Sequence, residues 1–561
     1  MKKVSIRQSR KIYMVTRSFP LLFILTGTIV LLLREIGNPS LGYPDADRIL
    51  MDGVFILDFL NDFPIDRIYD YTVEYFAQYP ALSIGYRPPF FPFVEALYNG
   101  VFGVNMWSSR LAVLTFVIVG ITFWFLLIRR VYDEITAFTA SLLLITTPFI
   151  VKWGWYTMGE LPVLSMAMVT SYVFYRYTES DRPIHLYWAA LLFGLTCWTK
   201  QTAVLLSLWF LFYIVITGNL SVYMKRREVW IAFVIALAIL VPLGAITLWL
   251  GKLNIAQSIG TGEAADALTR LSWDNLKLYF IALYEDHLTS PVLILSIIGI
   301  TWGIISQDRR LHYFLCLVLA TYLFFTYLTG KDNRYPIFWI PAFTLFAALP
   351  VYYFRTIGMT RVIAFFIVVF IAGYQVQMIY AKPVNYATGF DEAAKYVLDN
   401  SESATVFYDG YNNGYFTYFM RALDPERTMY VLRGDKLLTS SAILSNQWVE
   451  QHASSRDDIQ SILRNYGIQY VVVEKRDLSG HDVHQELRRY LKDGPFELNK
   501  SIDVETTRKP LQEQQILIYE YKDRQHITAD YLDLRLPVVG QTIRVPIRKL
   551  HSSESFRESD E

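Results

Sequence analysis

The chain has 561 residues, of which 53% are hydrophobic and 16% aromatic, and its formal net charge at pH 7 is +1. A charge so close to zero indicates no general polyanion partner, so we expect no binding to nucleic acid. Long uncharged segments and a mean hydropathy of +0.27 exclude an ordinary soluble protein and predict a polytopic membrane protein. Both cysteines, Cys197 and Cys316, fall inside apolar segments, so we expect no structural disulfide.

The first apolar segment follows a basic N-terminus and ends at Arg34 and Glu35. No small-residue cleavage site follows it, which indicates a retained transmembrane helix and not a signal peptide. Further apolar segments of near membrane-crossing length follow, and together they predict about eleven transmembrane helices. They lie at residues 110–128, 134–151, 160–176, 186–199, 202–217, 229–250, 291–306, 311–329, 335–354 and 361–380.

Basic residues gather in alternate connections between these segments, and the positive-inside rule places such connections on the cytoplasmic side. An odd number of spans then leaves the C-terminal part outside. The connections that hold Glu160, Lys200 and Arg334 also fall on the outer side. The basic connections contain Lys2 to Lys11, Arg129 and Arg130, Arg176 and Arg182, Lys225 to Arg227, Arg309 and Arg310, and Arg355 and Arg361.

The first outer loop, residues 35–108, places two carboxylates just beyond a membrane helix, at Asp45 and Asp47. We interpret this loop as the carrier of a catalytic base that acts on a lipid-linked substrate; a merely solvated acid is the alternative. Glu160, Lys200 and Arg334 stand at the ends of spans on the same side. Charges at that depth usually face a bundle interior or an aqueous cavity, although contact with lipid headgroups is possible.

Residues 251–290 form another outer connection, which we expect to be a mobile flap over the same face. His287 follows Glu285 and Asp286 there, and this group resembles a set of metal ligands. A solvated histidine is the favoured interpretation, and no metal site is assigned.

The composition after residue 380 changes to that of a soluble domain. Four segments read as strands, around residues 404–410, 428–434, 468–475 and 514–522, and three read as amphipathic helices, around 390–400, 455–467 and 482–493. This alternation predicts a soluble α/β domain over residues 381–525, followed by a polar and partly disordered tail over 526–561. The domain has no Gly-rich phosphate loop, so we expect a structural or acceptor-contacting role.

Four landmarks occur in order in the membrane part, residues 1–380. They are PDADR continuing to YRPPFFPFVEALYNGVFGVNMWSSRL in the first outer loop, TPFIVKWGWYTMGELPVL, GLTCWTKQ and RYPIFWIP. This order resembles the GT-C membrane glycosyltransferases, specifically protein O-mannosyltransferases, lipid A aminoarabinose transferases and their bacterial relatives. The family usually has an adjacent Asp-Glu pair in the first loop. Here Asp45 matches the Asp, Ala46 takes the Glu position, and Asp47 is an additional acid.

The resemblance implies an inverting glycosyltransferase that takes a sugar from a polyprenyl-phosphate donor and transfers it to a hydroxyl acceptor, whether lipid, glycan or protein. It implies a catalytic role for Asp45, with Asp47 and Glu160 as further catalytic candidates. The phosphate, which carries negative charge, would be bound by Arg87, with Lys200 and Arg334 behind it. Tyr86 and Tyr335 are the candidate substrate-binding aromatics. The expected location is the inner membrane of a bacterium, with the active site and C-terminal domain outside.

Two other classes of protein remain as alternatives, namely a transporter or flippase of lipid-linked sugars and a non-catalytic membrane scaffold. A transporter commonly has internal repeats and helices interrupted at the midplane, and the sequence has no convincing repeat. A divalent metal is possible but nothing in the sequence supports it.

Overall fold

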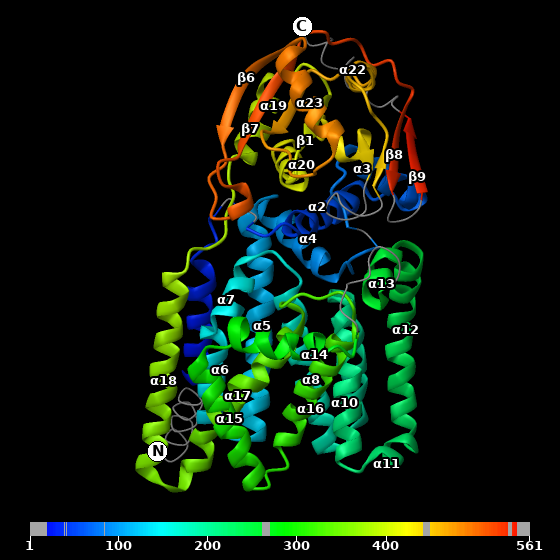
Figure 1. Cartoon of the computed structure of the whole chain (residues 1–561). Helices are drawn as coiled ribbons and strands as arrows, with labels where there is room; N and C mark the ends of the chain where they lie inside the picture. The colour runs from blue at the N-terminus through cyan, green and yellow to red at the C-terminus, as the bar shows by residue number, and fades with distance from the viewer. Residues whose placement is uncertain are drawn as a thin grey trace, which may run out of the picture.

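The computed structural model describes residues 19–546 except for residues 39, 41, 84, 261–269, 441–448 and 537–540. A bundle of long helices occupies one end of the molecule, and an α/β domain lies at the other end (Figure 1). Three helices of the first outer loop lie between them: α2 (Ala46–Asp62), α3 (Ile68–Gln78) and α4 (Phe90–Phe102). The molecule is mostly helical with several apolar helices, as the sequence predicted.

Each segment predicted as a span contains a helix. Within the described residues, four helices are long and apolar enough to cross a membrane, and a fifth span is reached if α6 and α7, bent by 58°, count as one. The predicted number of about eleven spans therefore stays a prediction. The bundle helices are Phe19–Leu33, α5 (Met106–Val131), α6 (Glu134–Thr146), α7 (Pro148–Trp155), α8 (Glu160–Ser180), α9 (Pro183–Thr199), α10 (Leu205–Ile216), α11 (Leu220–Met224), α12 (Arg227–Leu250), α15 (Ser290–Ile305), α16 (Leu311–Tyr327), α17 (Ile340–Tyr353) and α18 (Gly358–Ala381).

The apolar helices differ sharply in how much of their surface the protein itself covers. In the segment Tyr335–Tyr353, which ends with α17, 94% of the apolar window is buried, whereas the corresponding share for α12 is 11%. Helices that are apolar on all sides need either a protein core or lipid around them. We infer that α17 is a central helix of the bundle and that α12 presents most of its surface to lipid.

The first outer loop, for which the sequence predicted no helices, contains α2, α3 and α4. Its helices α2 and α4 pack against each other between the bundle and the C-terminal domain (Figure 1). Arg110 on α5 ties the chain before α2 to the bundle, because its guanidinium donates to the carbonyl oxygens of Glu35 at 2.6 Å and Ser40 at 2.6 Å. The helices of this loop are thus packed together, and Arg110 connects the chain before them to the bundle.

The C-terminal domain is built on a five-stranded sheet in the order β2-β1-β5-β7-β6. Strands β2 (Tyr430–Arg433), β1 (Thr405–Asp409) and β5 (Tyr470–Glu474) are parallel, while β7 (Gln515–Tyr521) and β6 (Phe496–Asp503) pair antiparallel. Strands β1 and β5 are buried along their whole length, as is usual for parallel strands covered on both faces. The covering helices are α19 (Phe390–Asn400), α20 (Asn413–Leu423), α22 (Arg456–Asn465) and α23 (Asp482–Asp493).

The segment 526–561, predicted as a polar tail, contains an ordered hairpin. Strands β8 (Tyr531–Leu536) and β9 (Gln541–Pro546) pair antiparallel and lie beside α3 (Figure 1). Leu532 and Leu534 on β8 and Ile543 on β9 are buried, so the hairpin packs its apolar face inward. Residues after 546 lie outside the described part of the chain.

Buried ion pairs join the first outer loop to the C-terminal domain. Arg421 on α20 is 2.5 Å from Asp58 on α2, and both side chains are at most 7% exposed. Tyr75 on α3 donates to the same carboxylate at 2.6 Å. Gly414, at the start of α20, lies so close to α2 that an added Cβ would meet the Asp47 carboxylate. Any larger residue at position 414 would force the Asp47 side chain to move.

The arrangement allows a direct test of the predicted membrane topology. The basic connection around α11 lies at the end of the bundle opposite the C-terminal domain (Figure 1). We expect cysteines placed at Asp70 in the outer loop and at Asp523 in the C-terminal domain to react with an impermeant maleimide on intact cells. A cysteine at Lys225 serves as the control and should react only after permeabilisation. Reaction of Asp70→Cys or Asp523→Cys only after permeabilisation contradicts the predicted topology.

Candidate active site

Asp45 lies at the N-terminal end of α2, but its carboxylate does not cap the helix. The carboxylate lies instead between two guanidinium groups: Oδ2 is 3.1 Å from Nη2 of Arg334 and 3.3 Å from Nη2 of Arg87. Arg87 also donates through Nη1 to the backbone carbonyl of Asp45 at 3.0 Å. Two predicted residues of the first outer loop, Asp45 and Arg87, therefore meet a third, Arg334, from a distant part of the chain.

Glu160 and Lys200 extend this group. Glu160 is the first residue of α8, and 2% of its side chain is exposed. Its Oε1 accepts a hydrogen bond from Nζ of Lys200 at 2.8 Å and lies 3.3 Å from Nε of Arg334. Lys200 directly follows α9, and Arg334 directly precedes the short helix η5 (Tyr335–Trp339). Arg334 is thus shared by the two carboxylates and joins them into one network.

Aromatic rings surround the cations of this network. The Arg334 guanidinium lies 4.9 Å from the ring centre of Tyr43 and 5.7 Å from that of Tyr335, and Nζ of Lys200 lies 5.5 Å from the Tyr335 ring. Tyr86 is the neighbour of Arg87, whose guanidinium is 5.9 Å from its ring. Such contacts stabilise cations by about 0.5–2 kcal/mol each. Both predicted aromatic residues therefore lie at the site.

The charges around Asp45 control its ionisation. Burial alone would raise the pKa of Asp45, but the guanidiniums of Arg87 and Arg334 outweigh burial and hold this pKa below its ordinary value. Asp45 is accordingly ionised at neutral pH. About a third of its side chain is exposed, 36%, so the carboxylate is still accessible to a ligand.

Asp47 is the one predicted catalytic residue that the structure turns away from this network. Its side chain is 4% exposed and packs against Gly414 of the C-terminal domain. Its Oδ1 accepts a hydrogen bond from the backbone N–H of Arg48 at 2.6 Å. Burial raises the pKa of Asp47 to about 6, the opposite direction to the shift of Asp45. Two acids that are two residues apart therefore occupy different environments.

Two cationic groups near Asp45 have donors without an acceptor among the described residues, and one of them, Arg48, was not among the predicted site residues. The Arg48 guanidinium has no carboxylate within ion-pair distance among the described residues, although it contributes to the low pKa of Asp45. The Nη1 of Arg334 is buried and finds no acceptor within the described part of the chain. The signal for Arg48 was its place in the segment PDADR, one helical turn after Asp45.

His287 differs from both interpretations considered for it. The side chain is fully buried, so the favoured solvated histidine is wrong. Its Nδ1 accepts a hydrogen bond from Trp339 at 3.0 Å, and its Nε2 lies 2.5 Å from the carbonyl oxygen of Asn333. This histidine holds the segment just before Arg334 in place. Among the described residues, no group of three His, Cys, Asp or Glu side chains is arranged to hold a metal. Of the predicted flap, residues 261–269, with Glu263 and Asp266, lie outside the described part.

An apolar cavity begins two residues after Arg87. Its volume is about 420 Å³, and it lies between α4, α9 and α12. The lining contains no charged side chain: Ile56, Pro89, Phe90, Phe93, Leu195, Trp198, Ile239 and Pro242. A cationic site and an apolar cavity are therefore neighbours on the Arg87–Phe90 segment, the combination expected for a ligand with an anionic head and an apolar tail.

Residues 86–246 match a family model described as dolichyl-phosphate-mannose-protein mannosyltransferase. The matched segment begins at Tyr86 and contains Arg87, Glu160 and Lys200. A comparison with curated protein sequences gave no match.

Solved structures share the fold at low sequence identity. ArnT from Cupriavidus metallidurans, in a crystal structure with bound undecaprenyl phosphate, is 12% identical with a TM-score of 0.59, and the match covers 89% of this chain and 98% of ArnT. The oligosaccharyltransferase of Archaeoglobus fulgidus, in a complex with Zn and sulfate, is 13% identical with a TM-score of 0.52, over 81% of this chain and 68% of that one. The same archaeal enzyme, AglB, was solved with an inhibitory peptide and a dolichol phosphate, with a TM-score of 0.50 at 11% identity over 82% and 69% of the two chains.

These matches support an integral membrane protein and a glycosyltransferase, and they do not favour the transporter alternative. The chain has the fold of the GT-C membrane glycosyltransferases, and the resemblance predicted from its sequence is confirmed.

Proposed function

We propose that this protein is an inverting glycosyltransferase that moves a sugar from a polyprenyl-phosphate donor to a hydroxyl acceptor at the outer face of a bacterial inner membrane. The observation that carries the proposal is the position of one accessible carboxylate, Asp45, between Arg87 and Arg334. The transfer needs a base for the acceptor proton and cations for the leaving phosphate, and this group contains both kinds of side chain.

The reaction is a single displacement. The acceptor oxygen attacks the anomeric carbon, its proton passes to the Asp45 carboxylate, and the bond from the anomeric carbon to the phosphate oxygen breaks. The electron pair of that bond stays with the polyprenyl phosphate, whose growing negative charge the guanidiniums of Arg87 and Arg334 stabilise. Attack opposite the leaving group inverts the anomeric configuration.

When the sugar donor binds, its phosphate would accept hydrogen bonds from arginine N–H groups that now bond to the carboxylates. The Arg48 guanidinium and the Nη1 of Arg334 have no acceptor among the described residues, although that Nη1 is buried. Arg87 bonds to both the carboxylate and the carbonyl oxygen of Asp45, and it can retain the second contact when a phosphate arrives. Competition of the phosphate for the two arginines would raise the pKa of Asp45 and make it a better proton acceptor.

In this proposal Glu160 positions Lys200 and Arg334 and does not take the proton from the acceptor. It is nearly fully buried and accepts from Lys200 at 2.8 Å, so it fixes the position of Lys200 and of Arg334. The apolar cavity next to Pro89 and Phe90 is suited to the first isoprenyl units of the donor. The undecaprenyl phosphate and the dolichol phosphate bound in two of the similar structures support a donor of this class.

The pH dependence of sugar transfer tests the choice of Asp45 over Asp47. With a synthetic polyprenyl-phosphate sugar in detergent, we expect kcat/KM to stay constant from about pH 7 to about pH 5, because Asp45 remains ionised in this range. If Asp47 were the base, activity would be lost as the pH falls below about 6, where that carboxylate takes up a proton.

The variant Arg334→Gln provides the control for this profile. Loss of one cation raises the pKa of Asp45, so the acidic limit of activity should move to higher pH. A wild-type profile that declines near pH 6 contradicts the assignment of Asp45. No transfer at any pH with any polyprenyl-phosphate sugar contradicts the proposed function itself.

A further inference from the structure

The carboxyl ends of the parallel strands of the C-terminal sheet lie near α2. In sheets of this kind, ligands bind at the carboxyl ends of parallel strands where the strand order reverses. Here β2 and β5 lie on opposite sides of β1, so the reversal is between β1 and β5. The loop after β1, residues 410–412, occupies this point and leads into α20, whose Gly414 contacts Asp47. The reversal point of the soluble sheet therefore faces the helix that carries the candidate base.

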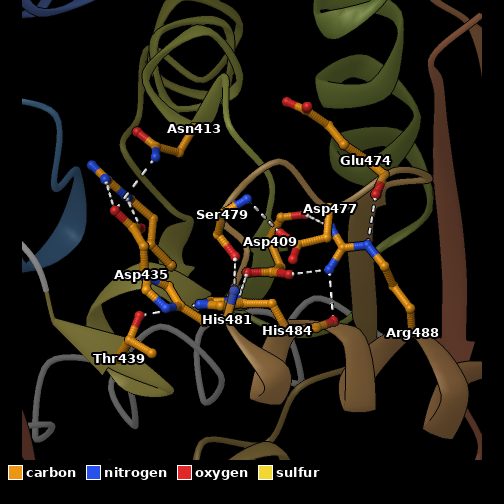
Figure 2. A network of polar contacts seen from close by, with 11 residues as sticks. Asp409, Asn413, Asp435, Thr439, Glu474, Asp477, Ser479, His481, His484 and Arg488 are labelled. Atoms are coloured by element: carbon orange, nitrogen blue, oxygen red, sulfur yellow. Dashed lines mark hydrogen bonds and ion pairs between the residues drawn. The ribbon is translucent and has the colours of Figure 1, made fainter. Parts of the chain in front are cut away.

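Buried charges lie at the strand ends beside this loop, and Figure 2 shows those around Asp409. Asp409 at the end of β1 is 2.6 Å from both Nδ1 of His484 and Nη1 of Arg488. Glu474 at the end of β5 accepts from the backbone N–H of Asn412 at 2.8 Å and from its amide at 3.0 Å. These carboxylates are at most 4% exposed and all have protein partners, so they position the loop and do not bind a ligand.

Two other side chains at this edge, Tyr411 and Arg508, do not take part in these ion pairs. Tyr411, at the tip of the loop, is half-buried, and its hydroxyl has no hydrogen-bond partner among the described residues. Burial raises the pKa of Tyr411, while Arg508 lowers it and the charge of Asp45 raises it. The phenol therefore lies within electrostatic reach of both a cation and the candidate base.

Arg508 is the cation. No carboxylate lies within ion-pair distance of it in the described part of the chain. Within the described residues, its Nη1 has two long contacts, 3.5 Å to Oδ1 of Asn412 and 3.4 Å to the hydroxyl of Tyr415. A half-buried guanidinium without an anionic partner keeps N–H donors that an incoming anion can accept.

The segment that carries Arg508 is tied to the membrane part of the protein. Thr506 pairs with Ala387, and the N–H of Ala387 donates to Oγ of Ser40 at 2.6 Å. Ser40 belongs to the segment that Arg110 holds, five residues before Asp45. Arg508 thus has a fixed position relative to the candidate base, as a residue that orients a substrate requires.

We propose that Tyr411 and Arg508 form the acceptor site of the enzyme, and that the acceptor carries an anionic group beside the hydroxyl that receives the sugar. The proposal rests on the proposed function. The anion would pair with Arg508, and the phenol of Tyr411 would hydrogen-bond the acceptor and bring its hydroxyl to Asp45. The cations at Arg87 and Arg334 stay with the donor phosphate, so the two substrates have separate anion sites.

Calorimetric binding of sn-glycerol 3-phosphate, with glycerol as the neutral control, tests the proposal on the full-length protein in detergent. Undecaprenyl phosphate is present at saturation to fill the donor site. We expect the wild type to bind glycerol 3-phosphate and not glycerol, Arg508→Gln to weaken this binding at least about tenfold, and Arg508→Lys to restore most of it. Tyr411→Phe, which keeps the ring but removes the hydroxyl, should weaken it by a smaller factor.

Arg489→Gln is the matched control, because Arg489 is 64% exposed on α23 and pairs with Glu486 away from the site. It should bind glycerol 3-phosphate as the wild type does. The acceptor proposal is overturned if the wild type does not prefer glycerol 3-phosphate to glycerol, or if Arg508→Gln binds it unchanged. Undecaprenyl phosphate binding, measured separately, should be equal in the wild type and Arg508→Gln. If the wild type does not bind undecaprenyl phosphate, the proposed function is contradicted. The comparison of glycerol 3-phosphate binding between the wild type and Arg508→Gln still tests the anion site at Arg508.

Discussion

The Asp45→Asn variant turns over at least about a hundredfold more slowly than the wild type while it still binds the donor. The amide keeps the shape of the carboxylate and can hydrogen-bond, but it cannot take the proton from the acceptor. Because Asp45 also neutralises part of the charge of Arg87 and Arg334, its loss leaves these cations free for the phosphate. Donor affinity is therefore expected to be unchanged or higher. The measurements are single-turnover sugar transfer and, separately, donor binding in detergent.

Two further acids serve as comparisons for this variant. Asp47→Asn should cost much less than Asp45→Asn, because the Asp47 side chain is buried against Gly414. Glu160→Gln should give an intermediate loss of turnover together with weaker donor binding, since Glu160 positions Lys200 and Arg334. If Asp47→Asn has no activity while Asp45→Asn is active, the catalytic base is Asp47 and not Asp45. Full activity in all three variants removes this group from the active site.

The Arg87→Ala variant should bind the polyprenyl-phosphate donor about ten- to a hundredfold more weakly than the wild type. Arg87→Lys should lose less, because the positive charge remains and only the bidentate fork is lost. In the structure, Arg87 uses both terminal nitrogens on Asp45, which shows that the fork can hold two oxygens at this position. Donor affinity is measured by calorimetry or by competition with a labelled lipid.

The matched control for Arg87 is Arg67→Ala. Arg67 belongs to the same outer loop, but its side chain is 43% exposed and pairs with Glu74 at the surface. Its loss should leave donor affinity unchanged, because exposed pairs contribute about 0–1 kcal/mol and this one is remote from Asp45. Equal affinity of the wild type and Arg87→Ala would remove Arg87 from the phosphate site.

The meeting of Asp45, Arg87, Glu160, Lys200 and Arg334 was predictable from sequence because lipid restricts where charges can lie. Each stands at or near the end of a helix on the same predicted side, and charges at such positions in a bundle tend to converge. The helices themselves could be located because an apolar segment in lipid must satisfy its backbone internally. The C-terminal strands followed from short β-branched and aromatic segments between helical patterns.

Other features depend on tertiary contacts that no local pattern records. Asp47 packs against Gly414, more than 360 residues further along the chain. Tyr411 follows β1 where the sheet reverses between β1 and β5, and Arg508, from the connection between β6 and β7, contacts the neighbouring Asn412. The hairpin of β8 and β9 did have a local signal, the alternation of Leu532 and Leu534 with charged residues. The many charged residues around this hairpin led to the prediction of a polar tail instead.

The buried pair of Arg421 and Asp58 has a consequence for how the protein comes apart. The C-terminal domain cannot separate from α2 without breaking this pair, and α2 cannot unfold locally without breaking it either. Hydrogen exchange in α2 and α20 should accordingly proceed through a shared opening, as one cooperative unit. A truncation after α18 would therefore remove a folding partner of the candidate active site along with the domain.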